Sequence, residues 1–240
     1  GDEMRGMNFS DRLGKAIKDK NNPSVLGLDP KLEYIPESIK EECRQQVDNA
    51  FQAAARSILE FNKRLIDATC DIIPAIKPQV AYYEMYGIEG LRVLEETIAY
   101  GREKGLIVIA DGKRNDIGPT AEAYSMAFLG KTDIFGKACR AFNADALTVN
   151  AYLGIDGIKP FIGDCMNENK GIFVLVKTSN PSSGQLQDMK LEDGRKVYEM
   201  MADLVREWGD PLIGENGYSS VGAVVGATYP EQLKILRKRM

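Results

Sequence analysis

The stretch Leu106–Thr120, LIVIADGKRNDIGPT, decides how the rest of the chain is interpreted. Its first five residues are apolar and mostly β-branched, as in a strand that is buried on both faces of a parallel sheet. Three charged side chains, Asp111, Lys113 and Asp116, follow directly. Pro119 then stands where the first turn of a helix tolerates proline. This order predicts one βα unit with polar groups at the carboxyl end of its strand.

The same order of elements recurs along the chain. The six predicted strands are Val25–Leu28, Ile72–Ile76, Leu106–Ala110, Ala146–Asn150, Ile172–Val176 and Val221–Gly226. Apolar residues at helical spacing predict helices over Pro36–Cys70, Tyr83–Lys104, Thr120–Leu129, Arg195–Trp208 and Pro230–Arg239. The polar stretch Pro181–Asp188 is the most loop-like and is expected to be a mobile lid. Because strands alternate with helices and no long linker interrupts them, we expect one α/β domain over residues 1–240.

Polar groups stand at the ends of five of these strands. They are Asp29, Lys77, Asp111, Asn150 and Lys177 with the three residues after it. In a TIM (β/α)₈ barrel the active site is built from the C-terminal ends of the strands. A doubly wound sheet, in contrast, places ligands only around one switch point. Polar ends on five successive strands therefore favour the barrel.

Composition removes several classes of function. Lys and Arg total 31 against 35 Asp and Glu, and the net charge of −4 disfavours sequence-independent nucleic-acid binding. No apolar run reaches the roughly 18 residues of a membrane span, and the start GDEMRGMNFS shows no signal peptide. Histidine is absent, which excludes imidazole catalysis. The four cysteines form no CxxC pair, so reduced thiols in a cytoplasmic protein without a metal cage are expected.

The charged residues after the third strand form the predicted reactive group. Asp111 and Lys113 are two residues apart, so they face the same side if the segment is extended. With Lys77 from the neighbouring strand end and Asp116, two ammonium groups can alternate with two carboxylates, which makes partial burial tolerable. Carboxylates favour the charged form of a nearby lysine, which can then give a proton to a carbanion. The alternative is a solvated loop with salt bridges.

At these residues the sequence resembles the orotidine 5′-phosphate decarboxylase family, in particular its bacterial form with the signature DxKRxDIGxT. DGKRNDIGPT at Asp111–Thr120 matches that signature at every fixed position. Further segments match in family order: GLDP at Gly27–Pro30, AIKPQVAYYE at Ala75–Glu84, TVNAYLG at Thr148–Gly154, KTSNP at Lys177–Pro181 and VGAVVGATYP at Val221–Pro230. DxKxxD alone also marks related sugar-phosphate decarboxylases and synthases, which generally use Mg²⁺. That class is the alternative enzyme.

The resemblance implies decarboxylation of orotidine 5′-phosphate to UMP in pyrimidine biosynthesis. Lys113 is implied to protonate C6 of the pyrimidine, with Asp111 beside the substrate carboxylate and Lys77 and Asp116 completing the charge array. Loss of CO₂ leaves a vinyl-type carbanion with little resonance relief. Nothing in the sequence suggests pyridoxal phosphate, thiamine or a metal as electron sink. The expected mechanism is therefore electrostatic stabilisation without a cofactor.

The resemblance also implies how the substrate is bound. Asp29 and Lys77 are implied to bind ribose hydroxyls, and Ser179 the pyrimidine ring. Without the resemblance, Asp29 and Ser179 are typical of an ordinary turn and loop. Ile117 and Thr120, like Asp116, are implied to reach the site of a partner subunit. The expected assembly is thus a homodimer with shared active sites.

The sequence departs from the family in its C-terminal part. Six strands precede Met240, whereas the family barrel has eight. A PGxGAQGG-like phosphate-binding loop and a last strand with a phosphate-binding arginine are both absent from these residues. We therefore expect a barrel whose last two βα units lie outside the given chain. A non-catalytic UMP-binding remnant is the alternative from a different functional class.

Overall fold

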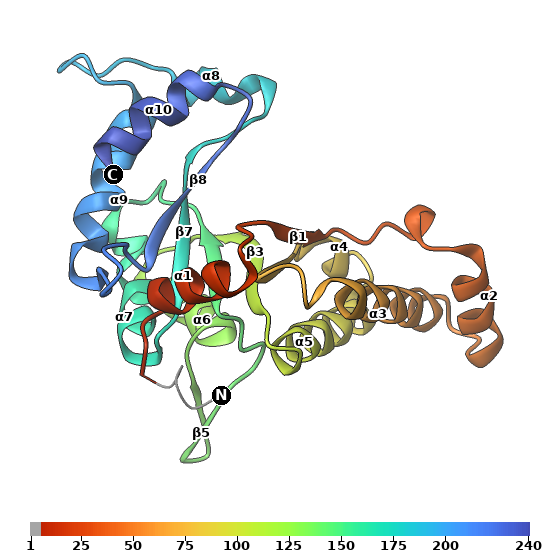
Figure 1. Cartoon of the computed structure of the whole chain (residues 1–240). Coiled ribbons are helices and arrows are strands. Elements are labelled where there is room, and N and C mark those ends of the chain that lie inside the picture. The colour runs from red at the N-terminus through yellow and green to blue at the C-terminus, as the bar shows by residue number, and fades with distance from the viewer. Residues whose placement is uncertain (1–5) are drawn as a thin grey trace. The chain divides into compact units, whose positions relative to one another are not determined.

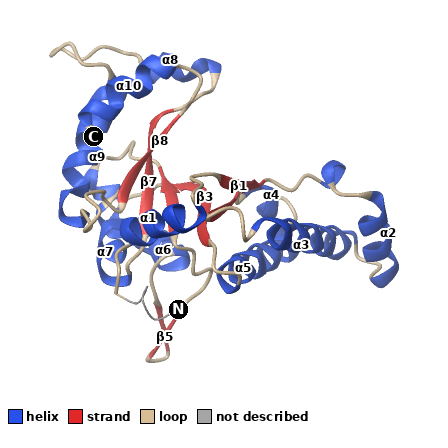
Figure 2. Cartoon of the chain, in the orientation of Figure 1, coloured by secondary structure: helices blue, strands red, loops and turns tan. Residues whose placement is uncertain are grey.

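The computed structural model describes residues 6–240, in which helices and strands alternate (Figures 1 and 2). Among these residues six strands form one sheet in the order β1-β2-β3-β6-β7-β8. Their bounds are β1 Val25–Leu28, β2 Ala75–Pro78, β3 Ile107–Arg114, β6 Ala146–Val149, β7 Gly171–Lys177 and β8 Val221–Val225. The pairs β1–β2, β2–β3 and β7–β8 are parallel. Sheet neighbours follow one another in the chain, as in a (β/α) barrel, which confirms the predicted fold class.

Helices connect and cover the strands. They are α1 Phe9–Lys20, α2 Glu37–Gln46, α3 Ala50–Thr69, α4 Ala81–Glu84, α5 Gly87–Glu103, α6 Gly118–Phe128, α7 Lys159–Glu168, α8 Gly184–Gln187, α9 Val197–Gly209 and α10 Pro230–Arg239. Short 3-10 turns are η2 Leu32–Tyr34, η3 Ile155–Gly157, η4 Pro181–Ser183 and η5 Asp210–Leu212. Within residues 6–240, no helix has the length and apolar character needed to cross a membrane.

The chain divides into two compact units, which are described separately. The N-terminal unit consists of Arg12–Gly112 and Met126–Ala146. The C-terminal unit consists of Lys113–Ser125, Leu147–Met240 and, among the described residues, 6–11. The division passes through β3, so the first residues of that strand belong to one unit and the last two to the other.

The core of the N-terminal unit forms where β1, β2 and β3 meet helices α3 and α5, which lie side by side (Figure 1). Its fully buried apolar side chains include Ile58, Ile66, Ile76, Leu94, Ile98 and Val108. A buried carboxylate also fixes β3, because Asp145 accepts a hydrogen bond from the Val108 backbone N–H at 2.9 Å. The same carboxylate pairs with Arg12 and Arg102 at 2.9 and 2.6 Å, so its burial is compensated.

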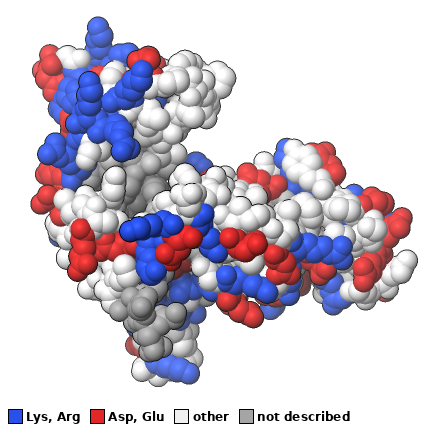
Figure 3. Space-filling model, viewed as in Figure 1, with Lys and Arg blue, Asp and Glu red and all other residues white. Residues whose placement is uncertain are grey.

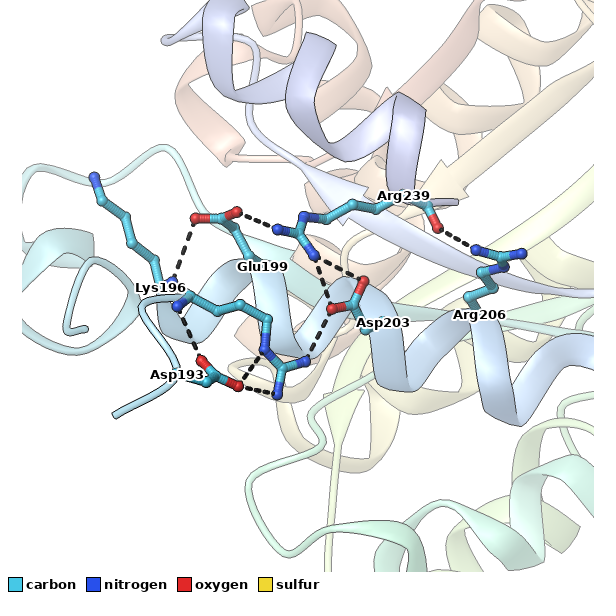
Figure 4. A network of polar contacts seen from close by, with 7 residues as sticks. Asp193, Lys196, Glu199, Asp203, Arg206 and Arg239 are labelled. Carbon is cyan, nitrogen blue, oxygen red and sulfur yellow. Dashed lines mark hydrogen bonds and ion pairs between the residues drawn. The ribbon is translucent and has the colours of Figure 1, made fainter. Parts of the chain in front are cut away.

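In the C-terminal unit, α9 packs on β7 and β8, and α10 packs on α9 (Figure 1). Lys and Arg side chains gather over α10 (Figure 3). One of them, Arg239, binds two carboxylates of α9, Glu199 at 2.7 Å and Asp203 at 2.9 Å (Figure 4). Asp203 also pairs with Arg195 at 2.9 Å. This network attaches the last helix of the chain to the helix that covers β7 and β8.

The predicted strand at Ile72–Ile76 is wrong at its start, because β2 begins at Ala75. The N–H groups of Ile72 and Ile73 donate instead to the carbonyl of Thr69 at 2.8 and 3.0 Å, which closes the end of α3. Pro74, which follows, has no N–H for a sheet hydrogen bond. The apolar run therefore contains a turn as well as a strand.

Two predicted helices are each divided in two. The helix predicted over Pro36–Cys70 breaks between α2 and α3, where the Asn49 side chain accepts a hydrogen bond from the Gln52 N–H at 3.0 Å and starts α3. The helix predicted over Tyr83–Lys104 breaks at Gly87, whose φ of 64° an L side chain rarely adopts. Apolar spacing continues through both breaks, so periodicity alone does not reveal them.

Two segments differ from the sequence prediction. A hairpin of β4 Thr132–Ile134 and β5 Lys137–Cys139 stands within a stretch predicted to contain no strand. Its turn residues Phe135 and Gly136 both have positive φ, 52° and 80°, as two-residue hairpin turns require. The segment predicted as a loop over Pro181–Asp188 forms η4 and α8 instead.

Candidate active site

A buried carboxylate lies at the end of β3 in the N-terminal unit. The side chain of Asp111 is 6 % exposed, and its Oδ2 accepts hydrogen bonds from Lys77 Nζ and Gln79 Nε2, both at 3.1 Å. The backbone keeps these residues together, since the N–H of Val80 donates to the Asp111 carbonyl at 3.2 Å. The arrangement is an ion pair with an added neutral donor, which makes burial of the carboxylate tolerable.

The contact between Lys77 and Asp111 is the part of the predicted charge array that lies within this unit. Gln79 was missed by the sequence argument. A signal for it exists, because Gln79 stands two residues after Lys77 and successive odd positions of an extended strand share one face. A neutral amide attracts less attention than a charge, although here it binds the same carboxylate oxygen.

Asp29 lies at the end of β1 in the N-terminal unit and is exposed, directly after the buried Leu28. The backbone before it is held by Tyr83, whose hydroxyl donates to the Leu28 carbonyl at 3.3 Å and accepts from Asn62 Nδ2 at 3.0 Å. Burial raises the pKa of Tyr83, and the negative charge of Asp29 raises it further. Tyr83 therefore stays a neutral phenol that fixes the end of β1, and the Asp29 carboxylate remains accessible.

Lys113 opens the polar segment of the C-terminal unit and is exposed. Its backbone has a φ of 49°, in the left-handed region. The expectation of an extended segment is therefore wrong at this residue, and the alternation of faces does not decide where its side chain points. Two hydrogen bonds link the end of β3 to β6: the Lys113 N–H donates to Thr148 Oγ1, and the Asn150 N–H donates to the Arg114 carbonyl, both at 3.0 Å.

The residues predicted to reach a partner subunit follow Lys113 in the same unit. Asp116 is half-buried, and its Oδ1 accepts a hydrogen bond from the Ile117 N–H at 2.7 Å. Ile117 is 61 % exposed, and Thr120 is exposed in the first turn of α6. Gly157 packs against this segment so closely that a Cβ on it would lie 2.8 Å from the Asp116 carbonyl oxygen. The segment before α6 is thus held from below while its apolar side chain faces outward.

A second lysine ends β7 in the same unit. Lys177 is 1 % exposed, and its Nζ donates to Ser183 Oγ at 2.7 Å and lies 3.3 Å from Asp188 Oδ1. These contacts explain why the expected lid is helical, because a buried ammonium group binds both of its ends. Ser179 follows and is exposed. Gly226, after β8, is so close that a Cβ on it would lie 2.9 Å from Ser179 Cβ.

The structure therefore places the predicted site residues in two groups. Lys77 and Asp111 are in contact in the N-terminal unit, where Asp29 ends a neighbouring strand. The others belong to the C-terminal unit and stand at or after the ends of β3 and β7: Lys113, Asp116, Ile117, Thr120 and Ser179. In residues 6–240, no three His, Cys, Asp or Glu side chains gather in a group that could hold a metal ion.

A separate cavity of about 670 Å³ lies among α9, β8 and α10 of the C-terminal unit. Its lining is mainly apolar and includes Val205, Ile213, Val221, Leu233, Leu236 and Met240. None of the predicted site residues lines it.

Comparison with known proteins gives one family. A family model described as orotidine 5′-phosphate decarboxylase / HUMPS family matches residues 22–239. Among curated relatives, the orotidine 5′-phosphate decarboxylase of Caldicellulosiruptor bescii is 46 % identical over 232 residues, which are 97 % of this chain and 76 % of the relative. That of Rhodopirellula baltica is 44 % identical over 234 residues, 98 % of this chain and 75 % of the relative.

Solved structures agree with these relatives. The structure of Leishmania donovani OMP decarboxylase superposes with a TM-score of 0.71 at 34 % identity, covering 97 % of this chain and 76 % of that chain. The structure of Leishmania donovani UMP synthase gives 0.72 at 33 % identity, covering 97 % of this chain and 42 % of that chain.

Proposed function

The chain belongs to the orotidine 5′-phosphate decarboxylase / HUMPS family, and from this membership we infer that it converts orotidine 5′-phosphate to UMP and CO₂. The observation that carries this function is the buried Asp111 carboxylate, held by Lys77 at 3.1 Å. It stands at the start of DGKRNDIGPT, where the charge array was expected. A solvated loop with surface salt bridges would not bury this carboxylate.

Lys113 is the proton donor in the proposed reaction. The bond between C6 and the substrate carboxylate breaks, its electron pair stays on C6, and the Lys113 ammonium gives C6 a proton. Water then returns a proton to the lysine. A positioned positive charge stabilises the developing carbanion most effectively where solvent is excluded. The exposed Lys113 side chain is available for this role in a way that a buried, fully bonded lysine is not.

Asp111 has the complementary role of a fixed negative charge beside the substrate carboxylate. Loss of CO₂ removes one of two neighbouring negative charges. This effect requires that Asp111 cannot turn away, and the hydrogen bonds from Lys77 and Gln79 supply that restraint. Asp29 and Lys77 would bind the ribose hydroxyls, and the exposed Ser179 hydroxyl the pyrimidine ring.

We also propose a homodimer in which Asp116, Ile117 and Thr120 complete the site of the partner subunit. The exposure of Ile117 and Thr120 supports this, since a partner surface would cover them. Mixing two inactive variants, Lys113→Ala and Asp116→Ala, tests it. A mixed dimer with shared sites contains one site with both native residues, so activity should reappear on mixing. Continued inactivity of verified mixed dimers would exclude shared sites.

A cytoplasmic location is proposed for this enzyme. The four cysteines, Cys43, Cys70, Cys139 and Cys165, are all free thiols, which is typical of proteins kept in a reducing compartment.

The decisive experiment is the ultraviolet absorbance of orotidine 5′-phosphate incubated with the purified protein, with no metal or cofactor added. Conversion to UMP is expected, and excess EDTA should leave the rate unchanged. A rate that EDTA abolishes would favour the Mg²⁺-dependent sugar-phosphate enzymes of the same superfamily. Binding of UMP without any turnover at high protein concentration would favour a non-catalytic binding protein and contradict the proposed function.

A further inference from the structure

Lys113 has an unusual backbone for its place in the fold. Its φ of 49° lies in a region that side chains with a Cβ adopt at an energetic cost. Three of the other non-glycine residues with positive φ in residues 6–240 are asparagines, Asn21, Asn143 and Asn169, which tolerate this conformation. Lys113 instead stands within strand β3. Such an outlier persists only where the surroundings hold it in place.

The surroundings that hold Lys113 include Thr148 of β6. The Thr148 side chain is buried, with 4 % of the residue exposed, and its Oγ1 accepts the Lys113 N–H at 3.0 Å. One residue later the contact is made by backbone atoms, since the Asn150 N–H donates to the Arg114 carbonyl. A side-chain hydroxyl thus takes part in joining β3 to β6 at the residue where the backbone departs from the strand conformation.

We propose that Thr148 is a positioning residue for the proton donor. Its hydroxyl holds Lys113 in the left-handed conformation, and this conformation directs the ammonium group toward the substrate. A strand conformation at Lys113 would send its Cβ in another direction, and a displacement of about 1 Å of a reacting group can cost 100-fold in rate. This inference rests on the proposed function for the role of Lys113, but the hold on its backbone can be measured separately.

Two substitutions separate the hydroxyl of Thr148 from its shape. Thr148→Val keeps the branched shape and removes the acceptor, whereas Thr148→Ser keeps the acceptor and removes a methyl group. For Thr148→Val we expect kcat to fall by roughly 10- to 100-fold with little change in KM, because only the position of the proton donor changes. Thr148→Ser should retain most of the native kcat. The dissociation constant of UMP, which needs no proton transfer, should be the same in both variants.

Amide hydrogen exchange at Lys113, measured by NMR on ¹⁵N-labelled protein, is the readout that does not depend on activity. Protection should be lost in Thr148→Val and kept in Thr148→Ser. Native protection or native kcat in Thr148→Val would overturn the proposal, as would an equal loss of kcat in both variants. If Thr148→Val does not fold, Thr148→Ala provides the same test. If the native protein does not convert orotidine 5′-phosphate, the proposed function fails while the exchange data still decide whether Thr148 holds Lys113.

Discussion

Two lysines of the C-terminal unit stand at the ends of strands and have opposite surroundings. Lys177 ends β7 and is buried, with its ammonium bonded to Ser183 and paired with Asp188. Lys113 lies near the end of β3, and its side chain is exposed while its backbone is in a disfavoured conformation. In sequence the two look alike, since each is a charged residue that follows a buried apolar run.

The difference shows two uses of a charge at the end of a strand. A buried ammonium group must find partners within the protein, because an unpaired buried charge is strongly unfavourable. The contacts of Lys177 therefore serve the fold, and they join β7 to the segment of η4 and α8. Lys113 carries backbone strain without burial of its side chain. This combination is typical of residues that act on a ligand.

Replacement of Lys113 should have the largest effect on activity. Lys113→Ala removes the proton donor and the positive charge at C6, and kcat should fall by about four orders of magnitude. Stability should be nearly native, because an exposed side chain is removed and alanine meets the same backbone strain. Turnover measured by absorbance, with thermal unfolding followed by circular dichroism, tests both statements. Near-native turnover in a folded variant would remove Lys113 from the mechanism.

Replacement of Lys177 should have the opposite signature. Lys177→Met leaves the hydroxyl of Ser183 and the carboxylate of Asp188 without their ammonium partner, and we expect a loss of about 1–3 kcal/mol in the free energy of unfolding. The loss of kcat should be less than about tenfold at a temperature where the variant is folded. Urea unfolding measures the first effect, with the exposed Lys190→Met as matched control. Native stability combined with a large loss of kcat would assign Lys177 to the chemistry.

A smaller effect is expected where the segment after Lys113 is supported from below. In Gly157→Ala the new Cβ would lie 2.7 Å from Asn115 Oδ1 and 2.8 Å from the Asp116 carbonyl oxygen. The segment must shift, so we expect about 1 kcal/mol of destabilisation and a several-fold lower kcat. Gly163→Ala on α7 is the control, since nothing lies within 4 Å of its Cβ position. If both variants keep native kcat, the position of Asp116 does not depend on Gly157.

Much of the fold was predictable because its signals are local. All six predicted strands of the sheet are present, since each is an apolar run bounded by polar residues. Errors occurred where two local signals overlapped. The apolar run at Ile72–Ile76 contains the end of α3 as well as β2, and helical spacing continues across the break before Asn49. The hairpin β4–β5 is too short, at three residues a strand, for alternation to be recognised.

The sequence by itself determined the α/β fold class, the family, and the residue types available for chemistry without histidine, because composition, motif order and periodicity are properties of the chain. Only the tertiary structure decided that Gln79 shares the Asp111 carboxylate with Lys77, that Lys177 is buried, and that Lys113 is held in a left-handed conformation. The last of these depends on a hydrogen bond between residues 35 positions apart. Burial and strain of this kind arise when distant segments pack together, and no local pattern encodes them.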